Sequence, residues 1–180
     1  MSLLEIEGLT HSFGENLLYK NAGFTLNRGE HIGIVGQNGT GKSTLIKICT
    51  EQIIPDSGRI VWQPNTTIGY LDQYAEIDHT LTMKEFLKSA FTKLFEMEAQ
   101  ALQLYEKAAD GDMKSLELAA RYQEQLEAHD FYSIDTAIDR VANGLGLLAI
   151  GLDRPIAEMS GGQRAKVILA KLLLEKPDVL

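Results

Sequence analysis

One short segment of the sequence carries the clearest chemical signal. It fits the pattern G-x-x-x-x-G-K-[S/T], whose glycines let backbone amides approach phosphate oxygens without a Cβ in the way. Its lysine would place a compact positive charge against the β- and γ-phosphates of a nucleotide, and its serine hydroxyl would bind Mg²⁺. The pattern therefore predicts a Mg-ATP site. Its residues are Gly36, Gln37, Asn38, Gly39, Thr40, Gly41, Lys42 and Ser43, followed by Thr44.

The flanking residues predict the elements that would position this loop. The apolar run His31–Val35 reads as a strand, and a helix is expected to open at Lys42 and continue past Ile48. A strand–loop–helix arrangement directs the amides at the helix start, and the positive end of its dipole, toward a bound anion.

A second candidate anion site lies near the end of the chain, at Met159–Arg164. Ser160 is a good N-cap and two glycines follow it, so a helix N-terminus is predicted there. On residue type alone, this segment could equally be a capped helix start with no ligand. By residue type alone, Phe13 could be a core residue, and a polar Gln73 after the predicted strand Ile68–Leu71 indicates nothing by itself.

Together, the segments at 36–43 and 159–164 resemble the ATP-binding cassette (ABC) ATPases, whose second motif usually begins with Leu where this chain has Met159. The resemblance implies that ATP is sandwiched between two cassettes, with the second motif docking on the γ-phosphate held by the partner cassette. It also implies that Gln73 senses Mg²⁺ and the attacking water, as a catalytic residue beside Lys42, and that Phe13 stacks on adenine. The implied second-motif residues are Ser160, Gly161, Gly162 and Gln163.

The expected fold class is α/β: a P-loop NTPase core of the ABC type with an antiparallel β subdomain and an inserted α-helical hairpin. The predicted divisions are an ATP-binding core at residues 1–82, the hairpin at 83–132, and a helical subdomain with the second motif at 133–180. Apolar residues stepping by three and four from Leu87 to Ala108 predict one long helix, and Leu116 and Leu126 predict a second.

The hairpin resembles the arm of the ABC-F branch, soluble tandem-cassette proteins that act on ribosomes and in some cases displace antibiotics. Between Met83 and Arg140 there are 7 Lys or Arg against 12 Asp or Glu, so a basic protein surface fits this arm better than RNA. An alternative is the ATP-binding subunit of a membrane transporter. A third hypothesis is a regulatory module that binds nucleotide without hydrolysing it.

The composition sets limits on location and partners. A net charge of −8 argues against a general polyanion binder, and no apolar run is long enough for a membrane span. The one cysteine, Cys49, excludes an internal disulfide, reads as a small core residue and favours a reducing, cytoplasmic setting. The resemblance implies a Walker B Asp and a catalytic Glu beyond Leu180. These 180 residues are therefore expected to bind nucleotide weakly and to hydrolyse it poorly.

Overall fold

The computed structural model describes residues 2–71, 78 and 80–180. The chain divides into two compact units: residues 1–70 with Val179, and residues 71–178 with Leu180. Among the described residues, no helix is both long enough and apolar enough to cross a bilayer. The first unit holds the glycine-rich loop, and the second holds the helical elements and the segment that begins at Met159.

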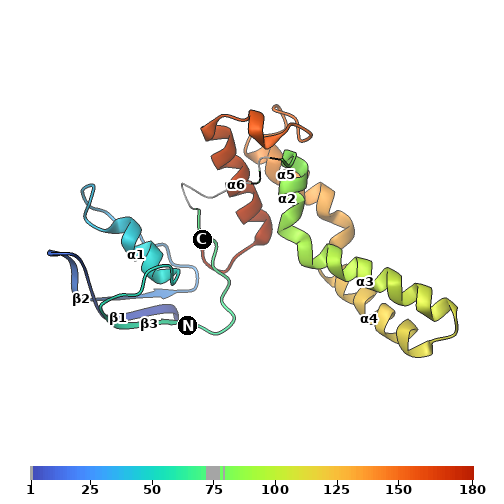
Figure 1. Ribbon diagram of the computed structural model, residues 1–180, viewed down its shortest axis with the longest axis horizontal. Coiled ribbons are helices and arrows are strands. Elements are labelled where there is room, and N and C mark those ends of the chain that lie inside the picture. Colours follow the sequence, from blue (N-terminus) through green and yellow to red (C-terminus); the bar gives the residue numbers. More distant parts are fainter. Residues whose placement is uncertain (1, 72–77, 79) are drawn as a thin grey trace. The chain divides into compact units, whose positions relative to one another are not determined.

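The first unit is built on a three-stranded antiparallel sheet of β1 (Ser2–Phe13), β2 (Asn16–Asn27) and β3 (Ser57–Trp62). Its strand order is β2-β1-β3, so β1 lies in the middle (Figure 1). Leu4 pairs with Leu26 on one side and with Trp62 on the other. Alternation along β1 sends Leu4 and Ile6 into the core and leaves Glu5 and Glu7 in solvent, as period-two patterning requires.

The core of this unit lies between the sheet and α1 (Lys42–Cys49). Its buried members are apolar and come from both elements: Leu4, Ile6, Leu9, Ile48 and Cys49. The Trp62 indole N–H donates to the Cys49 carbonyl at 2.9 Å, which joins β3 to the end of the helix. Burial raises the pKa of the Cys49 thiol, and its interpretation as a core residue is confirmed.

The strands predicted at His31–Val35 and Ile68–Leu71 do not form in the part of the chain that the structure describes. His31–Val35 forms no ladder among the described residues, and Val35 is 92% exposed. The strand expected at Ile68–Leu71 is reduced to one parallel bridge between Ile68 and Val179, with the Gly69 N–H donating to the Val179 carbonyl at 2.8 Å. A strand needs a hydrogen-bonded neighbour as well as β-branched residues, and the described chain offers these segments only that short contact.

The second unit begins with α2 (Met83–Lys88), a 3₁₀ turn at Ser89–Phe91, and α3 (Thr92–Ala109). The single long helix predicted here is therefore wrong. The Ser89 hydroxyl donates to the Phe86 carbonyl at 2.6 Å, and this side chain-to-backbone bond accompanies the tightened turn that separates the two helices.

A helical hairpin follows, made of α3 and α4 (Met113–Ala128), which run alongside each other in Figure 1. Gly111 adopts φ +98° in the connection, and the Asp112 carboxylate caps α4 by accepting from the amides of Lys114 and Ser115. Ala119 and Leu126 are buried on α4, as predicted, but Leu116 is 41% exposed. The buried stripe instead begins at Ser115, four residues before Ala119.

The rest of the second unit packs around α5 (Ile134–Gly144) and α6 (Gly161–Glu175), with short 3₁₀ turns at Phe131–Ser133 and Ile156–Glu158. The start of α6 at Ser160 matches the sequence prediction, and α6 ends where Lys176 turns left-handed before a proline. Its apolar core takes buried residues from α2, α4, α5 and α6, and partly buried residues of α3, such as Leu94 and Met97, pack against it. The fully buried large members are Met83, Leu87, Leu126, Ile138, Leu147, Ile156 and Val167.

Candidate nucleotide-binding site

The glycine-rich loop ends at the N-terminus of α1. Gly41 is the N-cap residue, with φ 95°, and Gly39 has φ 85°; both angles lie in the left-handed region that favours glycine. Gly41 has no side chain to cap the helix, so the amides of the first turn keep their capacity to donate to an anion.

The Lys42 side chain bends back over the loop that precedes it. Its ammonium donates to the carbonyls of Gly36 at 2.9 Å and Gln37 at 2.8 Å. The Thr40 hydroxyl also donates to the Gln37 carbonyl, at 2.9 Å, and a Cβ on Gly36 would lie only 2.8 Å from that hydroxyl. The Lys42 ammonium and the Thr40 hydroxyl thus both bind carbonyls of the loop that precedes α1.

Tyr19 on β2 contacts the end of the loop, and the sequence analysis did not single it out. Its hydroxyl donates to the Gly41 carbonyl, and a Cβ on Gly41 would approach the same hydroxyl oxygen to 2.6 Å. Burial raises the pKa of the Tyr19 phenol, so at neutral pH the group stays protonated and can donate. Only the hairpin register, which places Tyr19 opposite His11, brings it to this position.

A cavity of about 400 Å³ opens beside the loop and the start of α1. Lys42, Ser43 and Phe13 are all among its lining residues, and Phe13 is 54% exposed. Gly36, Gln37 and Thr40 belong to the same loop but do not line the cavity. The lining residues are Phe13, Asn16, Leu18, Asn38, Gly39, Gly41, Lys42, Ser43 and Thr44.

This arrangement combines an aromatic face with a cation and a helix N-terminus. Such a set can bind an aromatic base at one end and phosphates at the other. The Ser43 hydroxyl, exposed in the first turn of α1, is a hard oxygen donor of the kind that Mg²⁺ accepts beside substrate phosphates. The donor set therefore fits Mg²⁺ carried by a nucleotide, and the described residues contain no cluster of three or more His, Cys, Asp or Glu for an independent metal.

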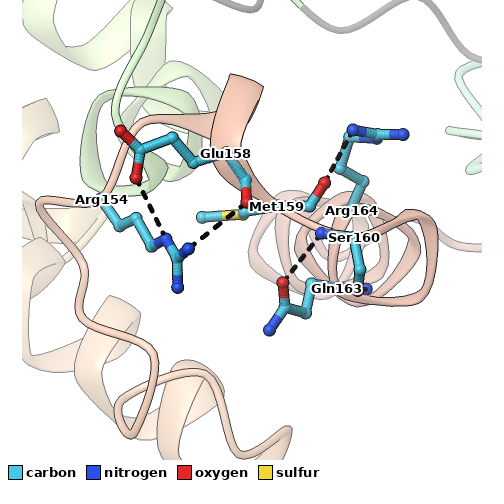
Figure 2. A network of polar contacts seen from close by, with 6 residues as sticks. All are labelled: Arg154, Glu158, Met159, Ser160, Gln163 and Arg164. Carbon is cyan, nitrogen blue, oxygen red and sulfur yellow. Dashed lines mark hydrogen bonds and ion pairs between the residues drawn. The ribbon is translucent and has the colours of Figure 1, made fainter.

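The second candidate segment forms the N-terminus of α6, as Figure 2 shows. The Gln163 amide donates to the Ser160 hydroxyl at 3.3 Å, and the Ser160 amide donates to the Gln163 side-chain carbonyl at 2.9 Å. This capping box confirms Ser160 as the N-cap residue. Nothing lies within 4 Å of a Cβ built on Gly161 or Gly162, so this end of the helix is open to a ligand.

Two arginines hold the backbone that enters α6 (Figure 2). Arg164 donates to the Met159 carbonyl at 2.8 Å, while Arg154 lies 3.4 Å from the Glu158 carboxylate and donates to the Glu158 carbonyl at 3.4 Å. Met159 itself is buried in the apolar core, which explains why an apolar residue of similar volume to Leu serves there. Gln73 lies outside the described residues.

Comparison with known proteins agrees with this geometry. The family model described as ABC transporter matches residues 19–180. An uncharacterized ABC transporter ATP-binding protein, YfmM, of Bacillus subtilis (strain 168) is 44% identical over 100% of this chain and 36% of its own length. ABC transporter F family member 5 of Arabidopsis thaliana is 31% identical over 98% of this chain and 27% of its own length.

The energy-dependent translational throttle protein EttA of Escherichia coli (strain K12) is 35% identical over 91% of this chain and 30% of its own length. The chain thus spans little more than a third of these relatives at most. Among solved structures, an ABC transporter ATP-binding protein from Pyrococcus furiosus superposes with a TM-score of 0.62 and 19% identity, over 95% of this chain and 70% of that one. The predicted fold class, an ABC-type α/β domain, is confirmed.

Proposed function

Since the chain belongs to the ABC transporter family of ATP-binding domains, we propose that it binds Mg-ATP beside α1 and uses ATP-driven closure against a second cassette to act on the ribosome. The single observation that carries the nucleotide part is the shared cavity. Phe13, Lys42 and the start of α1 all line one space of about 400 Å³.

In the proposed complex, each lining residue has one task. Phe13 stacks on the adenine ring, the loop amides bind the phosphate oxygens, and Lys42 leaves the loop carbonyls to contact the β- and γ-phosphates. Mg²⁺, when bound, neutralises phosphate charge, and Ser43 supplies its protein oxygen ligand. Gln73 is the proposed sensor of that ion and of the attacking water.

The proposed partner for the N-terminus of α6 is a nucleotide held by another cassette. Its Ser160 hydroxyl accepts from Gln163, which leaves the hydroxyl proton free to be donated to a γ-phosphate oxygen. The first amides of α6 add to the same anion site. Gly161 and Gly162 let a phosphate approach the backbone, since no side chain intervenes.

Three observations support the ribosome as the target. EttA, whose name describes a translational throttle, and a protein of the ABC F family are both more than 30% identical to this chain. Helices α3 and α4 pair in a long hairpin, which resembles the arm of the ABC-F branch. Between Met83 and Arg140 it is acidic, with 7 Lys or Arg against 12 Asp or Glu, which favours a basic protein surface as the contact.

Cosedimentation tests the proposal. The protein is centrifuged with ribosomes in a non-hydrolysable ATP analogue or in ADP, and we expect it in the ribosome pellet only with the analogue. Glu96→Lys with Glu106→Lys, two exposed positions on α3, should reduce pelleting severalfold. The matched control is Glu5→Lys with Glu7→Lys, the same charge change at exposed positions on β1, which should pellet normally.

The competing function is that of a transporter's ATP-binding subunit, and it predicts no binding to ribosomes. The family model is described as ABC transporter and YfmM is named as an ABC transporter ATP-binding protein, and both names favour this function. If the protein stays in the supernatant with either nucleotide and copurifies instead with an integral membrane partner, the ribosome proposal is wrong while the ATP site is untouched.

A further inference from the structure

His11 is a buried ionisable group that the proposed chemistry does not use. The residue is 6% exposed, and neither ring nitrogen has a hydrogen-bond partner among the described residues. A buried polar ring without partners opposes folding, and an apolar residue would fill the position at lower cost. Its presence therefore calls for a reason other than stability.

The surroundings of His11 connect it to the proposed base-binding residue. The ring centroids of His11 and Phe13 are 5.2 Å apart at an interplanar angle of 79°, an edge-to-face contact. On its other side, Nδ1 lies 3.6 Å from a carboxylate oxygen of Asp56. The second oxygen of Asp56 accepts from the backbone N–H of Ser12 at 2.8 Å, so this carboxylate is fixed to the strand that carries both rings.

Phe13 needs such support because its position is weakly constrained. It is the last residue of β1 and is 54% exposed, and β1 has register irregularities on both sides of His11. An exposed aromatic side chain at a strand end loses rotamer freedom when a base stacks on it. A fixed ring beside it reduces that loss by holding Phe13 in the orientation used for stacking.

We infer that His11 is a positioning residue that holds Phe13 in its base-stacking orientation. The inference rests on the proposed binding of ATP in the cavity lined by Phe13 and Lys42. It assigns His11 an effect on the base end of the ligand and none on the phosphate end.

A double-mutant cycle read with two ligands tests this. Calorimetry measures the binding of Mg-ATP and of Mg-tripolyphosphate, which lacks the base, to the wild-type chain, His11→Ala, Phe13→Ala and the double variant. We expect His11→Ala to weaken Mg-ATP binding by about 2- to 10-fold, the range of an aromatic edge-to-face contact, and to leave tripolyphosphate binding unchanged. In the double variant, the loss should match that of Phe13→Ala alone, because His11 acts through Phe13.

Three results would overturn the inference. In the first, His11→Ala binds Mg-ATP as the wild type does; in the second, it loses affinity for both ligands equally; in the third, its loss of affinity adds fully to that of Phe13→Ala. The second of these would indicate general damage to the sheet, which thermal unfolding of the same variants would register. A wild-type chain that binds neither ligand would instead overturn the proposed function on which the inference rests.

Discussion

At the residue scale, the side chains of Lys42 and Tyr19 hydrogen-bond to the backbone of the phosphate loop. Lys42 supplies the positive charge, and the Tyr19 hydroxyl donates to the carbonyl of Gly41, the N-cap residue of α1. The motif spacing predicted the first of these, because lysine and glycine have fixed roles in that pattern. No local pattern predicted Tyr19, since it reaches Gly41 only through the pairing of β1 with β2.

Removal of the Tyr19 hydroxyl tests its role. Tyr19→Phe deletes the hydrogen bond to the Gly41 carbonyl and keeps the ring, so we expect Mg-ATP affinity to fall about 5-fold, the equivalent of a net hydrogen bond worth about 1 kcal/mol. Calorimetry measures it, with Tyr105→Phe on the hairpin as a control that should bind normally. Unchanged affinity in Tyr19→Phe would mean that the loop holds its shape without this contact.

At the element scale, the sequence predicted helix ends better than strands. Caps act locally, so the starts of α1 and α6 followed from the loop that precedes Lys42 and from the N-cap at Ser160. Strands depend on neighbours far along the chain, and His31–Val35 has no ladder among the described residues. The Ser89–Phe91 turn was missed because apolar spacing continued smoothly across it.

The hairpin offers a test of which α4 face is buried. Ala119 is fully buried and the adjacent Ala120 is exposed. Ala119→Leu should overpack the contact with α3 and destabilise the chain by about 1–3 kcal/mol, whereas Ala120→Leu should change stability by less than about 0.5 kcal/mol. Urea unfolding followed by circular dichroism measures both. Equal effects would contradict the assigned face.

At the scale of the whole molecule, the two compact units carry complementary halves of the proposed chemistry. Residues 1–70 hold the cavity with Phe13 and Lys42, and residues 71–178 hold the capped N-terminus of α6. Each half is an anion site built on a helix start, which fits a family whose domains close on nucleotide in pairs. The division into three parts at 82 and 132 stays a prediction, as do the roles of the individual site residues.

Calorimetry of Mg-ATP binding to the whole chain tests the central claim most directly. The wild type should bind, Lys42→Ala should show no measurable binding, and Lys47→Ala, the same change at the far end of α1, should bind as the wild type does. Equal binding by the wild type and Lys42→Ala would contradict the assignment of this loop as the phosphate site.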